Sequence, residues 1–100
     1  LSQMSMHNPP HPGEFIREQD IEKGESSIRS LAESLGVAPS TLARIVSMRS
    51  AVSPEMALRL SKALGRTPES WLAMQHNYDL WVAKRSADLS DVQKIRFEAA

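Results

Sequence analysis

A single glycine, Gly36, separates two short segments of the sequence, in the stretch LAESLGVAPSTLARIV. Their apolar residues recur at the three- and four-residue spacing of amphipathic helices: Leu31, Ala32 and Leu35 before the glycine, and Leu42, Ile45 and Val46 after it. A glycine that ends one helix just before the next begins turns the chain sharply. The pattern therefore predicts two helices at a steep angle, the arrangement of a helix-turn-helix.

Capping residues and prolines mark the other helices. The stretches Ser53-Pro54-Glu55 and Thr67-Pro68-Glu69 each offer a capping hydroxyl, a proline at the first helical position and an acid in the first turn. No segment combines strict alternation with β-branched residues. We expect an all-α protein of five to six helices, over residues 13–23, 28–35, 39–47, 54–64 and 68–85, with Ser27 capping the second.

The 100 residues are enough for one small core and therefore one domain. We expect a flexible proline-rich lead over residues 1–12, a helix-turn-helix domain over 13–85, and a tail or short helix over 86–100. The capping box that begins at Ser90 and reaches Gln93, followed by Ile95 and Phe97, leaves both possibilities open for this last segment.

Charge is distributed unevenly along a chain whose net charge is zero. Residues 26–66 carry six basic against two acidic side chains, whereas residues 1–25 carry two against five. A basic helix-turn-helix is typical of a DNA-binding surface. The sequence has no cysteine, so it predicts neither a disulfide nor a thiolate metal site, and it has no apolar run long enough for a membrane span; we expect a cytoplasmic protein.

The helix after Gly36 offers a polar face opposite its apolar one. On a helical wheel Ser40, Arg44 and Ser47 share this face, with Thr41 at its edge. An arginine can form a bidentate bond with guanine in the major groove, while hydroxyls reach bases or phosphates. Arg29 and Arg49 are expected to contact the DNA backbone on either side. The candidate DNA-binding residues are Ser27, Arg29, Pro39, Ser40, Thr41, Arg44, Ser47 and Arg49. The alternative is a helical hairpin with an ordinary solvated face.

The helix expected from residue 68 is apolar on two sides. One stripe comprises Trp71, Met74, Tyr78, Trp81 and Val82, and the other comprises Leu72, His76, Leu80 and Ala83. A monomer of this size has one core to line, so the second stripe predicts a homodimer interface. Two recognition helices would then lie about 34 to 36 Å apart on an inverted-repeat operator in double-stranded DNA.

Catalysis and metal binding are not indicated. His7 and His11 alone make a weak metal site, and His76 stands apart from them. Glu14, Glu18 and Glu22 share one helical face that is expected to be solvated. The sequence contains neither a glycine-rich phosphate loop nor a nucleophile elbow, so we expect no enzyme, no metal and no cofactor.

Three stretches resemble antitoxins of the HigA/VapI type from bacterial addiction modules. They are residues 7–14, residues 31–45, and AVSPEMALRLSKALGRTPESWLAMQHNYDLW over residues 51–81. The resemblance covers residues 7 to 83. It implies a lambda-repressor-like bundle, and a homodimeric repressor that binds its own operator and neutralises a cognate HigB toxin, usually a RelE-like ribonuclease.

Four positions depart from the family pattern. Ala38 stands where a capping serine or threonine is usual, and Ile28 replaces a common glutamine that contacts phosphate. Ser47-Met48 stands where Asn-Gly is usual, which leaves no glycine for a left-handed turn after the recognition helix. These changes bear on operator identity and affinity.

Two alternatives remain for the function. A stand-alone phage-type repressor without a toxin would share every DNA-facing prediction. A protein-interaction module would instead use the acidic first 25 residues, which could engage a basic toxin.

Overall fold

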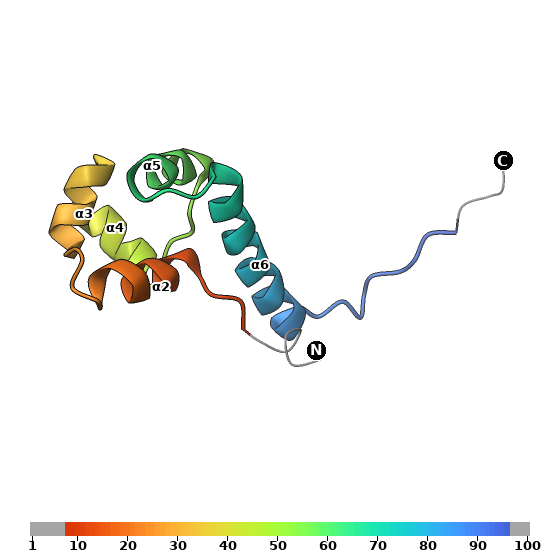
Figure 1. Ribbon diagram of the computed structural model, residues 1–100. Helices are drawn as coiled ribbons and strands as arrows, with labels where there is room; N and C mark the ends of the chain where they lie inside the picture. The colour runs from red at the N-terminus through yellow and green to blue at the C-terminus, as the bar shows by residue number, and fades with distance from the viewer. Residues whose placement is uncertain (1–7, 97–100) are drawn as a thin grey trace, which may run out of the picture.

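The structure is a computed structural model, and it describes residues 8–96. Its elements follow in the order α2 (Pro12–Ile16), η1 (Arg17–Ile21), α3 (Ile28–Leu35), α4 (Pro39–Val46), α5 (Pro54–Leu64) and α6 (Pro68–Ser86). The π-helical turn η1 continues α2, so residues 8–96 form five helices and no strand (Figure 1). The predicted all-α class is confirmed.

Three helices begin at the hydroxyl caps that the sequence predicts. The side chains of Ser27, Ser53 and Thr67 accept hydrogen bonds from the amides three residues further on, at 3.1, 3.1 and 3.0 Å. Each satisfies one of the amides that a helix start leaves without a partner. The bounds predicted for α3 and α5 match those observed, and α4 ends at Val46, one residue before the predicted end.

The first helix differs from the prediction in its second half. The amide of Glu22 donates to the carbonyl of Arg17 at 2.7 Å, a five-residue step, so the helix widens into η1. Helical structure ends at Ile21, two residues before the predicted end, and Gly24 follows with a φ of 80°.

The core lies where α2, α3, α4, α5 and the first half of α6 meet. Its buried side chains are Ile16, Leu31, Ala32, Leu35, Leu42, Ile45, Val46, Val52, Met56, Ala57, Leu60, Trp71 and Met74. The core is mostly aliphatic, with Trp71 as its one fully buried aromatic residue among those described. The two helices of the helix-turn-helix, α3 and α4, therefore form one side of the hydrophobic core.

The segment predicted to be a loose lead is packed at its end. His11 and Pro12 are both fully buried, and His11 is the N-cap of α2. The flexible segment therefore does not extend to residue 12. The proline-rich composition, which suggested flexibility, instead marks a buried helix start. Residues 1–7, which include the metal candidate His7, lie outside the described residues.

The second half of α6 leaves the bundle, and the chain beyond it runs outward (Figure 1). Residues 87–96 form no helix, so the structure has the tail and not the short sixth helix over that range. Leu89, Val92 and Ile95 are exposed there, and a short helix with no neighbouring surface for its apolar side is not stable alone. Phe97 lies outside the described residues. Over residues 8–96 none of the helices has the length and apolar character that crossing a membrane requires.

Candidate nucleic-acid interface

The turn between α3 and α4 is built on Gly36. This residue has a φ of 73°, and the amide of Val37 donates to the carbonyl of Ala32 at 3.0 Å, which closes the end of α3. A side chain at position 36 would be strained in this left-handed conformation. The glycine thus lets only three residues separate the end of α3 at Leu35 from the start of α4 at Pro39.

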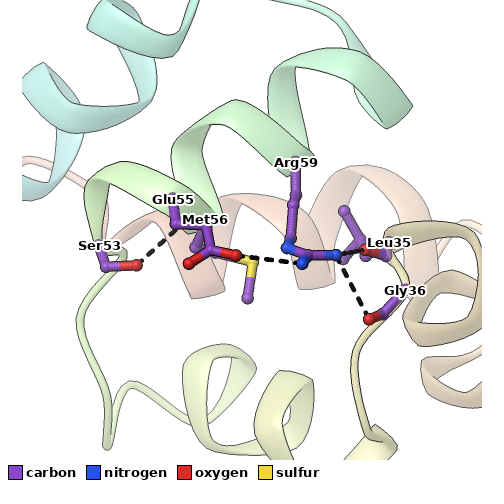
Figure 2. Close-up of polar contacts among 6 residues, drawn as sticks. All are labelled: Leu35, Gly36, Ser53, Glu55, Met56 and Arg59. Carbon is purple, nitrogen blue, oxygen red and sulfur yellow. Dashed lines mark hydrogen bonds and ion pairs between the residues drawn. The ribbon is translucent and has the colours of Figure 1, made fainter.

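Arg59 of α5 is hydrogen-bonded to the backbone of this turn (Figure 2). Its Nη1 donates to the carbonyls of Leu35 and Gly36 at 2.8 and 3.3 Å, and its Nη2 lies 3.1 Å from Glu55 Oε2. The guanidinium therefore satisfies carbonyls that the end of α3 leaves free, and it ties them to α5. Sequence reasoning counted Arg59 only as part of the basic charge, since nothing local indicates a contact 24 residues away.

The polar face of α4 is free of the protein's own described side chains. Leu42, Ile45 and Val46 are buried, while Ser40, Arg44 and Ser47 are exposed on the opposite side. The other candidates Ser27, Arg29, Pro39 and Arg49 are exposed as well, and Thr41 is half-buried. The hydroxyl of Ser27 is hydrogen-bonded to both the amide and the hydroxyl of Ser30. The main structural role of Ser27 is therefore to cap α3. The predicted candidates thus lie on α3, on α4 and directly after it.

Three arginines supply the positive charge of this surface. Arg29, Arg44 and Arg49 take part in no ion pair among residues 8–96. Two other basic residues of the central segment are engaged elsewhere, because Arg59 holds the turn and the guanidinium of Arg66 lies over the rings of Phe15 and Trp71, 5.2 and 5.6 Å from their centres. Free arginines beside exposed hydroxyls suit phosphate and base-edge contacts.

Comparisons with known proteins agree with this geometry. The family model described as Helix-turn-helix matches residues 21–72. The regulator YddM of Escherichia coli K12, named as an uncharacterised HTH-type transcriptional regulator, is 35% identical over 92 residues, which are 92% of this chain and 97% of the relative. Antitoxin HigA-1 of Vibrio cholerae serotype O1 is 36% identical over 73 residues, covering 73% of this chain and 69% of HigA-1. The chain belongs to the helix-turn-helix family of HigA-type antitoxins.

Solved structures of this family share its fold. The antitoxin GraA matches with a TM-score of 0.79 and 38% identity, over 92% of this chain and 99% of GraA. GraA in complex with its operator matches with a TM-score of 0.78 and 38% identity, over 94% of this chain and 95% of that one.

Both ends of α4 in this HigA-type chain show the departures expected from its sequence. Ala38 makes no side-chain cap, so the first turn depends on Pro39 and on the core. After the helix, Met48 has a φ of 66° where glycine is usual in the family. A left-handed backbone costs a residue with a β-carbon about 1–2 kcal/mol.

The start of α2 touches the end of α4. A β-carbon at position 13 would clash with the backbone of Ile45, because it would lie 1.7 Å from the carbonyl oxygen. Only glycine fits there. The adjacent His11 accepts the Gly13 amide on Nδ1 at 2.9 Å and meets the ring of Tyr78 edge-on at 5.0 Å. Burial lowers the pKa of His11, although Asp79, Glu14 and a backbone hydrogen bond at Ser50 act in the opposite direction.

The loop after α4 is tied to α6 by a buried amide. Gln75 accepts a hydrogen bond from the amide of Val52 at 2.9 Å and donates to Asp79 Oδ1 at 2.9 Å. Sequence reasoning did not identify the structural roles of Gln75, His11 and Gly13, because their partners Val52, Tyr78 and Ile45 are far away in the sequence. Among residues 8–96 there is no group of three or more histidine, cysteine or carboxylate side chains that could hold a metal ion.

Burial on α6 follows the position along the helix more than the two predicted stripes, because Val82 of the first stripe is exposed and Leu72 of the second packs on the core. Trp71 and Met74 are buried in the core, and Tyr78 and Trp81 are half-buried. Of the four predicted dimer residues, Leu72 is half-buried against the protein's own core, whereas His76, Leu80 and Ala83 are exposed. Leu80 has 55% of its surface exposed, and the neighbouring Val82 has 38%. The free apolar surface therefore lies on the half of α6 that leaves the bundle.

Proposed function

We propose that this protein is a cytoplasmic homodimeric antitoxin that represses its own operon through α3 and α4 and neutralises a RelE-like ribonuclease toxin. The observation that carries the DNA-binding part is the exposure of Ser40 and Arg44 on one side of a helix whose other side is in the core. The proposed operator contacts are Ser27, Arg29, Pro39, Ser40, Thr41, Arg44, Ser47 and Arg49. The complex of GraA with its operator supports the same use of this fold.

Two arginines of the interface are expected to act differently. Arg44→Ala should weaken binding to the cognate operator by about 1–3 kcal/mol and relax base preference at one position of each half-site. Arg49→Ala should weaken binding to all sequences alike and flatten the salt dependence, because a phosphate contact releases counterions without reading bases. Quantitative footprinting at two salt concentrations on the DNA directly upstream of the gene measures both effects. Equal losses on specific and unrelated DNA for Arg44→Ala would remove its assigned role.

The homodimer part is supported by the exposed apolar side of α6. His76, Leu80 and Ala83 lie there with Leu72 at the core end, and a two-fold contact would cover the same residues on both copies. A dimer also brings two sets of free arginines to the DNA, which a surface with three per subunit needs for tight binding.

The toxin part is supported by the acidic side chains of residues 14–25, which precede α3 in the chain. Glu18, Glu22 and Glu25 are exposed, Glu14 is half-buried, and Glu22 is paired with Arg17 at 3.4 Å. The segment formed by α2, η1 and the turn after them therefore offers acidic side chains to a basic ribonuclease. Deleting these residues would remove Ile16 from the core, so the test is charge reversal. Glu18→Lys combined with Glu25→Lys should slow capture of the adjacent gene's product while operator binding persists. Unchanged capture kinetics would rule out this surface.

The same footprint, run with and without the product of the adjacent gene, separates an antitoxin from a stand-alone repressor. An antitoxin is expected to change its footprint or its affinity when that product is added, whereas a stand-alone repressor is not.

A further inference from the structure

The residue that follows the C-cap of α4 adopts a backbone conformation that its side chain disfavours. Met48 has a φ of 66°, and its amide donates to the carbonyl of Ile45 at 2.9 Å. The next two amides, of Arg49 and Ser50, both donate to the carbonyl of Arg44, at 2.8 and 3.1 Å. Glycine would close the helix in the same way without the steric cost, so the turn itself does not explain a methionine.

The side chain of Met48 does not explain its presence through the core either. It has 41% of its surface exposed, and it belongs neither to the buried cluster nor to the partly buried residues packed on it. Its neighbours Ser47 and Arg49 are exposed, and its loop is bonded to the backbone of Arg44. An exposed apolar side chain is therefore held, under backbone strain, two residues after α4, next to the exposed Ser47 and Arg49.

The chemistry of the major groove indicates what such a side chain can contact. Serine, threonine and arginine on the polar face of α4 suit the polar atoms of base edges, while the one apolar group that a base presents in the major groove is the methyl group of thymine. Strained residues concentrate at functional sites, where the surrounding structure maintains them. We propose that Met48 is a specificity-determining residue that contacts a thymine methyl group in each operator half-site, an inference that rests on the DNA-binding function proposed above.

Replacing thymine by deoxyuridine tests this contact directly, because it removes only the methyl group. The footprint of the unmodified protein on the DNA directly upstream of its gene first defines the protected bases. Each protected thymine is then replaced in turn, and affinities are measured for the parent protein, Met48→Gly and Met48→Asn. At one symmetric pair of positions the parent should lose about fourfold in affinity per methyl group, as expected for one buried methyl-sized group.

The two variants should lose affinity for the unmodified operator and show no deoxyuridine penalty at that pair. Glycine and asparagine both tolerate the left-handed backbone, so a shared loss reports the side chain and not the turn. Met48→Gly should also raise the thermal unfolding midpoint by about 4 °C, which shows that it is folded.

Arg66→Gly is the matched control, since Arg66 is the other non-glycine residue of the described chain with positive φ, at 64°. It should leave the deoxyuridine profile of the parent unchanged. Identical profiles for the parent and both Met48 variants, or full affinity of Met48→Gly for the unmodified operator, would overturn the inference while leaving the repressor function intact. No footprint with the parent protein would instead remove the DNA-binding function itself, and the inference with it.

Discussion

At the scale of single residues, His11 and Gly13 hold the start of α2 against both α4 and α6. His11 is 2% exposed, caps α2 through Nδ1 and packs on Tyr78, while Gly13 lets the two backbones touch at Ile45. The proline-rich composition of this segment suggested a loose lead. Composition alone does not reveal that a neighbouring helix covers the segment. The end of α4 is thus supported by a segment more than 25 residues earlier in the chain.

We expect His11 to make the stability of the fold depend on pH. Burial lowers its pKa below the usual 6.5, so as pH falls the unfolded chain binds the proton first. The contribution of His11 should be fully present above about pH 6.5 and decrease as pH falls from there towards the lowered folded pKa. Thermal unfolding at pH values between 8 and 5 measures this dependence.

The variant His11→Asn supplies the control. Asparagine can still accept the Gly13 amide at the N-cap but does not titrate. It should be less stable at pH 8 by about 1 kcal/mol, because the edge-on contact with Tyr78 is lost, and its stability should fall less between pH 7 and pH 5. Parallel pH profiles for the two proteins would show that another group is responsible.

At the scale of secondary-structure elements, local signals were sufficient wherever a helix end is capped by its own neighbours. Ser27, Ser53 and Thr67 place α3, α5 and α6, and Gly36 ends α3. The same kind of signal at Ser90 did not produce a helix within the described residues, because a capping box supplies an end but no surface to pack on.

Contacts between elements were not predictable in this way. The exposed residues of the candidate interface follow from helical periodicity alone, since a wheel separates Arg44 from Leu42. The residues that position the interface, Arg59 and Gln75, act across 24 and 23 residues of sequence. Local patterns contain no information on such partners, so the exposed side of α4 was predicted and the contacts that support the helix were not.

Restoring the missing cap of α4 should stabilise the protein. Ala38 has an extended backbone, with φ −68° and ψ 145°, close to that of the working cap Ser53, with φ −80° and ψ 167°. Ala38→Ser is therefore expected to raise the free energy of unfolding by about 0.5–1 kcal/mol, as measured by urea denaturation. The reverse change, Ser53→Ala, should lower it by about 1 kcal/mol. A loss from Ser53→Ala without a gain from Ala38→Ser would show that position 38 cannot use a hydroxyl.

At the scale of the whole molecule, the chain is more extended than a compact domain of its length. Its radius of gyration is 17.4 Å, against about 13 Å for a compact domain of 100 residues. The excess comes from the outer half of α6 and the tail that leaves it (Figure 1). Five of the seven large apolar side chains exposed among the described residues lie in this part of the chain: Leu80, Val82, Leu89, Val92 and Ile95. This distribution favours association through the C-terminal part.

Leu80→Asp is expected to disrupt the proposed homodimer. Burying a leucine contributes about 2 kcal/mol and a two-fold interface buries it twice, so the dissociation constant of the dimer should rise about a thousandfold. Sedimentation equilibrium measures the change, and operator affinity should fall with it, because a monomer contacts a single half-site. Leu58→Asp, on α5, is the control for adding a charge, because Leu58 is 60% exposed and lies outside the C-terminal part. A parent protein that is monomeric at operator-binding concentrations would contradict the dimer.

The separation of α4 into a buried side and an exposed side has a consequence for how related helix-turn-helix proteins diverge. Ser40, Arg44 and Ser47 contribute nothing to the core, whereas Gly13 and Arg59 hold the helix in place from its other sides. Substitutions on the outer side can therefore accumulate without loss of folding. Under the proposed function, duplicated copies in one genome would come to bind different operators when a few of these exposed side chains change, and so avoid cross-regulating one another.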